Sequence, residues 1–390
     1  MVTSKLSDQL IELYILLKSL SIQNKDKIYD LKVWNVTVIM MDIVAYAIAM
    51  TLKNTKGVMV MTNKYLDGRP ETHATIAAKD YGIVLRRGSE ELDGFGIREP
   101  LIFESEGTYF MHYDASDDKT GWRNYLATSK DLINWEKKGV ILNLGVEGED
   151  DSSCAVYGVT YLEDGVWHMF YIGSDYYREH PYDIPDFPYV TMKAKSDSPY
   201  GPWIKQDIVP FRMKENTYYS TTASSGAIVK AGDEYLQFFS ASVLDANKIT
   251  KRTLGIARTK DLDKEWTIDP EPLFPLEEQI ENSTVFYEEE TETWFLFTNH
   301  VGLNEIKEYT DAIWVYWTKD IQNWDVNNKA LVLDGNMCSW SKTIIGAPSV
   351  FRLGNKLALY YDGVEGAGFD HFYRDIGLAW LDLPIQLPQK

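Results

Sequence analysis

The sequence predicts an all-β fold, a five-bladed β-propeller preceded by a short, partly helical N-terminal extension. Three observations predict it. A short phrase ending in Trp occurs four times, at intervals of roughly 60 residues. A pattern of two aromatic-rich strands joined by a turn precedes each copy and occurs a fifth time near the end of the chain. Residues 1–60 differ from the rest in being helix-like and apolar.

The Trp phrase is interpreted as structural. Its copies are 127-ATSKDLINWEKKG-139, 194-AKSDSPYGPWIKQ-206, 257-ARTKDLDKEWTID-269 and 316-YWTKDIQNWDVNN-328. The Ser/Thr-Lys/Asp segment is expected to form the turn after the third strand of each repeat, with an Asp side chain capping exposed backbone groups. The Trp is expected to pack between neighbouring blades.

The strand pairs define the repeating unit. They lie at 101–116, 156–174, 226–242, 284–300 and 348–363, the last followed by 374-RDIGLAWLDL-383. Turns such as Glu106-Gly107 and Gly354-Asn355 have the residues that hairpins require. Each unit is therefore a strand, a tight turn, a second strand, a loop, a third strand and an edge strand. Four antiparallel strands repeated around an axis describe a propeller blade.

The fifth unit lacks the Trp phrase, so its outer strand must come from elsewhere. The segment 81-YGIVLRRG-88 precedes the first unit and is expected to supply it. This pairing would join the first and last blades and leave no open sheet edge there. The rival fold, a β-sandwich, does not account for the repeat.

We expect two parts, an N-terminal extension at residues 1–75 and the propeller domain at 76–390. Segment 5–20 has apolar residues at helical spacing. Segment 33–52 is an apolar run long enough to span a bilayer, but it contains Asp42, which is costly there. We expect a buried helix or strand; a membrane anchor and a homo-oligomer contact stay open as alternatives. The run begins too far from Met1 for an ordinary signal peptide, which favours a cytoplasmic location.

The charge and the cysteine content of the chain argue against several classes of protein. The chain has 39 Lys and Arg against 58 Asp and Glu, a formal net charge of -19, and no basic stripe. Nucleic-acid binding, which needs a positive surface, is therefore not expected. Two cysteines, Cys154 and Cys338, cannot organise a disulfide scaffold or a structural zinc site, although one bridge between them stays open.

The candidate site is predicted where the inner strands of the five blades begin, because these positions converge at one mouth of the central channel. Two carboxylates stand out there, Glu99 and Glu281, which we place at the same position of the repeat. Hydrolysis of a glycosidic bond requires two carboxyl groups. One protonates the leaving oxygen, and the other activates water or attacks the sugar carbon.

Several segments resemble the five-bladed propeller glycoside hydrolases related to family 43, with families 32, 117 and 130 as more distant relatives. The first blade, 97-IREPLIFESEGTYFMHYDA-115 with 128-TSKDLINWEKKG-139, is similar to the blade that carries their catalytic base. The phrase 198-SPYGPW-203 is frequent among them. The segment 280-IENSTVFYEEETETWFLFTN-299 resembles the blade with their general acid. The resemblance covers roughly residues 80–383.

The resemblance implies a glycosidase that inverts configuration, with Glu281 as the acid and Glu99 in the place of the base. The family usually has Asp rather than Glu at the latter position. It also implies a third carboxylate, whose expected place falls near Ser224, Ser225 and Gly226, where no acid occurs. Asp150 or Asp151 is the available substitute. We assign Asp151 to this role, with a solvated loop position as the alternative for either.

The remaining candidates are expected to contact sugar. Arg98 is expected to hold a hydroxyl or fix the base, and Arg374 to contact substrate or form a buried pair with Asp375. Aromatic faces pack on sugar rings and histidines donate hydrogen bonds to hydroxyls. Further contacts of these kinds are predicted for Tyr157, Tyr219, His300, Trp340 and His371.

The sequence predicts a carbohydrate as the partner, no nucleic acid or membrane partner, and no required cofactor. A structural calcium ion stays open, because an oxygen-lined propeller axis leaves no spacing motif. Two other functions remain. One is a phosphorylase like those of family 130, which would need clustered basic residues to hold phosphate. The other is a carbohydrate-binding propeller without catalysis, because the expected third carboxylate is missing.

Overall fold

The computed structural model describes most of the predicted propeller domain. It describes residues 74–388 except 89–92, 117–120, 179–183, 304–307 and 369–371. The expected N-terminal helix and the apolar run 33–52 lie outside the described residues, and of the expected extension, residues 1–75, only residues 74 and 75 are described. Within the described ranges, no helix combines the length and apolar character needed to cross a membrane.

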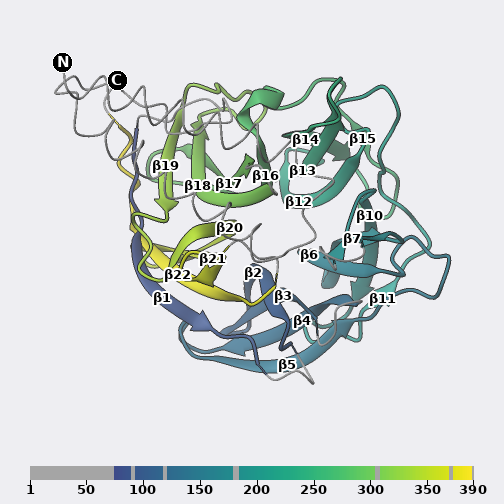
Figure 1. Ribbon diagram of the computed structural model, residues 1–390, viewed down its shortest axis with the longest axis horizontal. Helices are drawn as coiled ribbons and strands as arrows, with labels where there is room; N and C mark the ends of the chain where they lie inside the picture. The colour runs from purple at the N-terminus through teal and green to yellow at the C-terminus, as the bar shows by residue number, and fades with distance from the viewer. Residues whose placement is uncertain are drawn as a thin grey trace, which may run out of the picture. The chain divides into compact units, whose positions relative to one another are not determined.

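The described strands form five four-stranded antiparallel units around a common centre (Figure 1). Blade one contains β2 (Gly96–Ser105), β3 (Thr108–Ser116), β4 (Trp122–Ser129) and β5 (Trp135–Leu142). Blade two contains β6 (Cys154–Glu163), β7 (Val166–Ser174), β10 (Val190–Ser196) and β11 (Ile204–Lys205). Short strands β8 (Tyr177–Arg178) and β9 (Ile184–Pro185) pair with each other between β7 and β10.

The other three blades follow the same order. Blade three contains β12 (Thr222–Ala231), β13 (Glu234–Leu244), β14 (Thr250–Thr259) and β15 (Thr267–Ile268). A 3-10 turn, η1 (Leu276–Glu278), leads into blade four, with β16 (Ile280–Glu288), β17 (Thr293–Leu303), β18 (Glu308–Thr318) and β19 (Lys329–Asp334). Blade five contains β20 (Ser341–Leu353), β21 (Lys356–Glu365), β22 (Arg374–Asp382) and β1 (Lys79–Leu85). The innermost strands are β2, β6, β12, β16 and β20 (Figure 1).

Strand β1 completes blade five, which confirms the predicted closure. It pairs antiparallel with β22 from Lys79 opposite Trp380 to Leu85 opposite Ile376. Asp80 anchors it by accepting hydrogen bonds from the Tyr361 hydroxyl at 2.5 Å and from the backbone N–H of Ser339 at 2.7 Å. Just before β1, the N–H groups of Ile76 and Ala78 donate to β19 of blade four, so this segment also ties blade four to blade five.

The repeated Trp residues pack between blades, as predicted. Each contacts a ring on the second strand of the preceding blade, with ring centroids 5.3 to 6.1 Å apart. The pairs are Trp135 with Tyr360, Trp203 with His112, Trp266 with Phe170 and Trp324 with Phe238. The Asp of the phrase caps the turn: Asp131 Oδ1 accepts the N–H groups of Ile133 and Asn134. The phrase is therefore a structural element that seals neighbouring blades.

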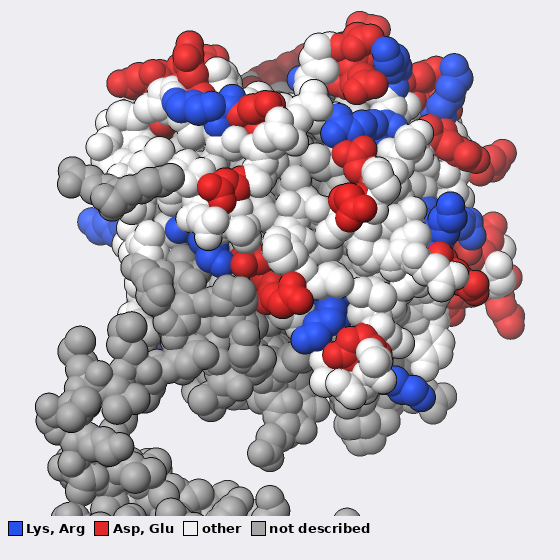
Figure 2. Space-filling model, turned by 90° about the horizontal axis from the view of Figure 1, so that it is seen from above, with Lys and Arg blue, Asp and Glu red and all other residues white. Residues whose placement is uncertain are grey.

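Cys154 and Cys338 are both buried and free, which decides against the disulfide that the sequence left open. On the face shown in Figure 2, basic side chains lie among acidic ones and form no continuous band.

A β-bulge interrupts the inner strand of every blade. The pairing with the second strand shifts between Arg98 and Leu101, Val156 and Val159, Ser224 and Ala227, Glu281 and Thr284, and Gly346 and Ser349. In four blades the first bulged residue has a positive φ, at 54°, 51°, 57° and 49° for Glu99, Tyr157, Asn282 and Ala347. This conformation is unfavourable for residues other than Gly, so each bulge needs support from its surroundings.

The support comes from the neighbouring blade. The backbone N–H of each of these four residues donates to a polar side chain on the second strand of the preceding blade. The bonds are Glu99 to Asp362 (3.1 Å), Tyr157 to Asp114 (2.7 Å), Asn282 to Ser240 (2.8 Å) and Ala347 to Asn299 (3.0 Å). In blade two the equivalent second-strand residue is Ile172, which offers no acceptor, and Ser225 of blade three does not adopt the left-handed conformation. A left-handed bulge residue therefore occurs in those blades where the preceding blade provides a side-chain acceptor for its N–H.

Replacing Ser240 by Ala tests this support. The change leaves the buried N–H of Asn282 without its acceptor, so we expect the free energy of unfolding to fall by about 1–3 kcal/mol in urea denaturation. Ser242→Ala is the matched control, because this serine is also buried on β13 and its hydroxyl makes no hydrogen bond within the described chain. An equal loss in both variants would contradict the role of the cap.

Candidate active site

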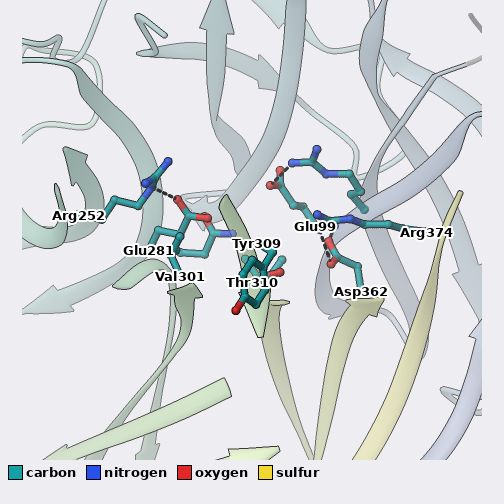
Figure 3. Close-up of a pocket in the computed structure, with 11 residues that line it drawn as sticks. Glu99, Arg252, Glu281, Val301, Tyr309, Thr310, Asp362 and Arg374 are labelled. Carbon is teal, nitrogen blue, oxygen red and sulfur yellow. Dashed lines mark hydrogen bonds and ion pairs between the residues drawn. The ribbon is translucent and has the colours of Figure 1, made fainter. Parts of the chain in front are cut away.

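A central pocket contains three carboxylates and three arginines. They are Arg98, Glu99, Arg252, Glu281, Asp362 and Arg374 (Figure 3). Glu99 and Glu281, the two predicted catalytic residues, therefore line the same pocket from blades one and four. The view in Figure 3 shows the Glu281–Arg252 pair on one side and Glu99, Asp362 and Arg374 on the other. Tyr309 and Thr310 of β18 also line this pocket.

Three neighbours act on Glu99. Its Oε1 accepts a hydrogen bond from Arg98 Nη2 at 3.0 Å, and Asp114, which lies opposite Arg98 on β3, also influences its ionisation. Its backbone N–H is bound by Asp362. Burial disfavours the charge, but the positive charge of Arg98 and its hydrogen bond outweigh it, so the pKa of Glu99 lies below its ordinary value. The carboxylate is therefore ionised near neutral pH.

Asp362 links the bulge of blade one to blade five. While Oδ2 accepts the Glu99 N–H, Oδ1 accepts a hydrogen bond from Arg374 Nη1 at 2.9 Å. Both side chains are buried, with exposed fractions of 0% and 5%. Arg374 thus pairs with Asp362 and not with Asp375, which instead binds Arg86 and Arg87.

Glu281 is placed by an arginine from blade three. Its Oε2 accepts a hydrogen bond from Arg252 Nε at 2.9 Å, and 30% of its side chain is exposed. The backbone N–H of Arg252 is bound in turn by Gln279 Oε1, and its guanidinium lies 5.6 Å from the ring centre of Phe187. Arg252 therefore reaches the pocket from the start of β14.

The strand pairing corrects the assumed equivalence of Glu99 and Glu281. Arg98 pairs with Asp114 just before the bulge of blade one, whereas Glu281 pairs with Asn299 just before the bulge of blade four. Glu281 is therefore equivalent to Arg98, and Glu99 to Asn282. The two glutamates are one residue apart in the repeat, and they meet in one pocket from different positions.

The predicted third carboxylate, Asp151, does not line the pocket. It is buried in the segment that precedes β6, where it binds Lys205 Nζ of β11 at 2.6 Å and the Tyr171 hydroxyl of β7 at 2.8 Å. The acid beside Glu99 is instead Asp114, in the middle of β3 and 2% exposed. Burial and then the charge of Glu99 raise the pKa of Asp114 well above its ordinary value.

The predicted sugar contacts fall into two groups. Arg98 and Arg374 line the pocket. Tyr157 is 1% exposed, Tyr219 lies in the core between blades two and three, and His300 is buried against the ring of Trp314. Trp340 donates to the Tyr361 hydroxyl at 2.8 Å within blade five. These four aromatic and histidine side chains do not line the pocket because they pack between or within blades. His371 lies outside the described residues.

Four further residues at or beside the site were not predicted from the sequence: Asp114, Asp362, Arg252 and Tyr309. A signal for the first two was present, because 112-HYDA-115 and 360-YYDG-363 place an acid at the same position of two otherwise apolar central strands. Arg252 and Tyr309 have no comparable pattern. Among the described residues, no group of three or more His, Cys, Asp or Glu is arranged to hold a metal ion.

Comparisons with known proteins show which proteins share this fold. No protein-family model matches the chain. One stretch of 50 residues is 44% identical to 1,2-beta-oligomannan phosphorylase of Thermoanaerobacter sp. (strain X514), covering 12% of this chain and 17% of that protein. The chain thus matches only a small part of this relative's length.

Solved structures are similar over most of the chain. A glycoside hydrolase superposes with a TM-score of 0.61 at 16% identity, over 80% of this chain and 94% of the other. A family 117 glycoside hydrolase from Zobellia galactanivorans gives 0.60 at 14% identity, over 81% and 94%. A thermostable family-43 glycoside hydrolase gives 0.53 at 14% identity, over 77% and 97%. The chain therefore has the β-propeller fold of these glycoside hydrolases, as the resemblance implied.

The Arg374–Asp362 pair is expected to support the pocket. Arg374→Gln would leave Asp362 charged, buried and unpaired, so we expect a loss of about 3–5 kcal/mol in the free energy of unfolding. The matched control is Arg212→Gln, which breaks the exposed pair with Asp150 and should change stability by less than about 1 kcal/mol. Equal, small losses in chemical denaturation would show that solvent screens both pairs alike.

Proposed function

We propose that the protein cleaves terminal sugar residues from a glycan with inversion of configuration, using Glu281 as general acid and Glu99 as general base. One observation carries the proposal: two glutamates from blades that are not adjacent line one pocket. The glycoside hydrolase fold supports the same conclusion. A carboxylate pair across a pocket is the arrangement that this reaction needs.

Glu99 is suited to act as the base. Its lowered pKa keeps it ionised, and the hydrogen bond from Arg98 restricts the orientation of the carboxylate. The bond from its N–H to Asp362 fixes the backbone from which the side chain extends. A water molecule between this carboxylate and the anomeric carbon would lose its proton to Glu99 as it attacks.

Glu281 is suited to act on the leaving group. Arg252 binds one carboxylate oxygen, Oε2, and so restricts the orientation of the side chain. A proton on Glu281 would pass to the glycosidic oxygen as the bond to the anomeric carbon breaks. Arg252 would then stabilise the carboxylate that forms.

A pocket lined from several blades favours action at the end of a glycan. The lining comes from blades one, three, four and five, so it encloses the site from several directions. Val301, Tyr309 and Thr310 from the β17–β18 hairpin form part of this wall. Such a site admits a terminal sugar more readily than the interior of a long chain.

Substituting the two glutamates tests the mechanism. We expect Glu281→Gln and Glu99→Gln each to lower kcat by about 10²–10⁴ with smaller changes in KM, because proton transfer is lost while binding remains. Glu289→Gln, at an exposed site after β16, is the control. Substrates are aryl arabinofuranosides, xylosides, galactosides, fucosides and mannosides, with the anomeric form of the product followed by NMR.

Two results would contradict these roles. Unchanged kcat in Glu281→Gln would remove it as the acid. A product that retains the configuration of the substrate would remove Glu99 as the base for a direct attack of water.

A second candidate is phosphorolysis, favoured by three arginines in the pocket and by the short match to an oligomannan phosphorylase. Inorganic phosphate would then replace water as the nucleophile, and the product would be a sugar 1-phosphate. Assays of β-mannosides and mannan oligosaccharides with and without phosphate separate the two reactions. Binding of these sugars without cleavage under either condition would instead favour a carbohydrate-binding propeller.

A further inference from the structure

Thr310 brings a buried hydroxyl group to the central pocket. It lies on β18, lines the pocket together with Glu99 and Glu281, and is 9% exposed. In the view of Figure 3, Tyr309 and Thr310 lie between the Glu281 side and the Glu99 side of the pocket. The Thr310 Oγ1 atom is buried and has no hydrogen-bond partner in the part of the chain that the structure describes. Most buried polar side-chain atoms have such a partner, so this hydroxyl is an exception.

Strand β18 contains a bulge next to Thr310. Ala312 pairs with His300 of β17. Thr310 pairs with the following residue, Val301, so Asp311 is an extra residue in β18. Side chains alternate between the two faces of a strand, and an extra residue reverses this alternation beyond the bulge.

The bulge turns Thr310 toward blade five. In a regular strand it would share a face with Ala312 and Trp314, which pack with side chains of blade three. After the reversal it shares the face of Ile313, which packs with side chains of blade five. Thr310 accordingly lies against Gly346 of that blade. A Cβ atom added to Gly346 would be 2.5 Å from Thr310 Oγ1 and 2.7 Å from Thr310 Cβ.

Thr310 therefore occupies the place of a side chain on the inner strand of blade five. Gly346 lies just before the bulge of β20, opposite Asp362. The equivalent residues of blades one and four are Arg98 and Glu281, which both line the pocket. Blade five has no side chain at this position, and the Thr310 hydroxyl group from blade four takes the space.

We propose that Thr310 is a specificity-determining residue whose hydroxyl group hydrogen-bonds to a hydroxyl group of the sugar in the pocket. The inference rests on the proposed function only in that the pocket binds a sugar; it does not depend on which residues transfer protons. A site built to bind a sugar hydroxyl rejects the deoxy analogue, because a buried polar group of the protein then loses its partner. The expected ligand is a terminal sugar with a free hydroxyl group at the contacted carbon.

Two substitutions separate the hydroxyl group of Thr310 from the shape of its side chain. Thr310→Val keeps the shape and removes the hydroxyl group, whereas Thr310→Ser keeps the hydroxyl group and removes a methyl group. Thr191→Val is the matched control. Thr191 is also buried in a strand, and its Oγ1 donates to the backbone oxygen of Ala223 at 2.8 Å. It lies in blade two, whereas the pocket is lined from blades one, three, four and five.

Thermal unfolding without sugar tests whether the Thr310 hydroxyl group has a structural role. We expect the melting temperature of Thr310→Val to be unchanged or to rise by up to about 3 °C, because valine buries no polar atom. Thr191→Val should melt at a lower temperature, because it loses a hydrogen bond that the folded protein makes. A lower melting temperature for Thr310→Val would show that its hydroxyl group stabilises the fold, and would overturn the proposal.

Sugar binding is the decisive measurement. Calorimetric titration with the methyl glycosides of arabinose, xylose, galactose, fucose and mannose identifies the sugar that wild type binds most tightly. For that sugar we expect Kd to rise about 5–50-fold in Thr310→Val, to rise less than about threefold in Thr310→Ser, and to stay unchanged in Thr191→Val. Among the monodeoxy derivatives of that sugar, one should bind equally to wild type and Thr310→Val, because the proposed bond is absent from both complexes.

The outcomes separate this proposal from the glycosidase itself. Weaker binding in Thr310→Val, together with a wild type that cleaves no glycoside, would support the role of Thr310 and contradict hydrolysis. An unchanged Kd in Thr310→Val while wild type cleaves the sugar would overturn the role of Thr310 alone. Equal weakening for every deoxy derivative would also overturn it, because Thr310 would then act through packing. A wild type that neither binds nor cleaves these sugars would overturn both proposals.

Discussion

The centre of this propeller depends on one interaction. It is a hydrogen bond from the backbone N–H of a strained residue in one blade to a polar side chain of the preceding blade. Four blades use it, with Asp362, Asp114, Ser240 and Asn299 as acceptors. Each bond stabilises a left-handed residue at a bulge and also joins two blades. Because the bulges occur on the innermost strands, the same bonds determine how side chains enter the central pocket.

The candidate active site is built from this framework. Glu99 is itself a bulge residue, so its direction follows from the bond to Asp362, and its neighbour Asp114 is the acceptor for the next bulge. Catalytic and structural roles therefore overlap at the same positions. Arginines then separate the acids: Arg98, Arg252 and Arg374 bind Glu99, Glu281 and Asp362, whereas Asp114 accepts the backbone N–H of Tyr157 and the side-chain amide of Asn124. The electrostatic environment differs accordingly from one acid to the next.

Sequence patterns predicted the fold well because each blade is a local unit. Trp135 and its three counterparts seal neighbouring blades, and Asp131 caps its turn. The position of β1 followed from the missing strand of the last repeat. Patterns predicted the site less well. Tyr157 and His300 were expected at the mouth but are buried, because aromatic residues beside an inner strand also fill the space between blades.

The sequence by itself determined the repeated strands, the closure of the propeller and the two glutamates near the channel. Only the tertiary structure decided that Glu281 corresponds to Arg98 and not to Glu99, because a one-residue shift at a bulge changes which side chains face the pocket. It also brought Arg252 and Asp362 from distant strands to these glutamates. The ionisation of each acid depends on burial and on its nearest charges, and both arise from the packing of blades that are far apart in the chain.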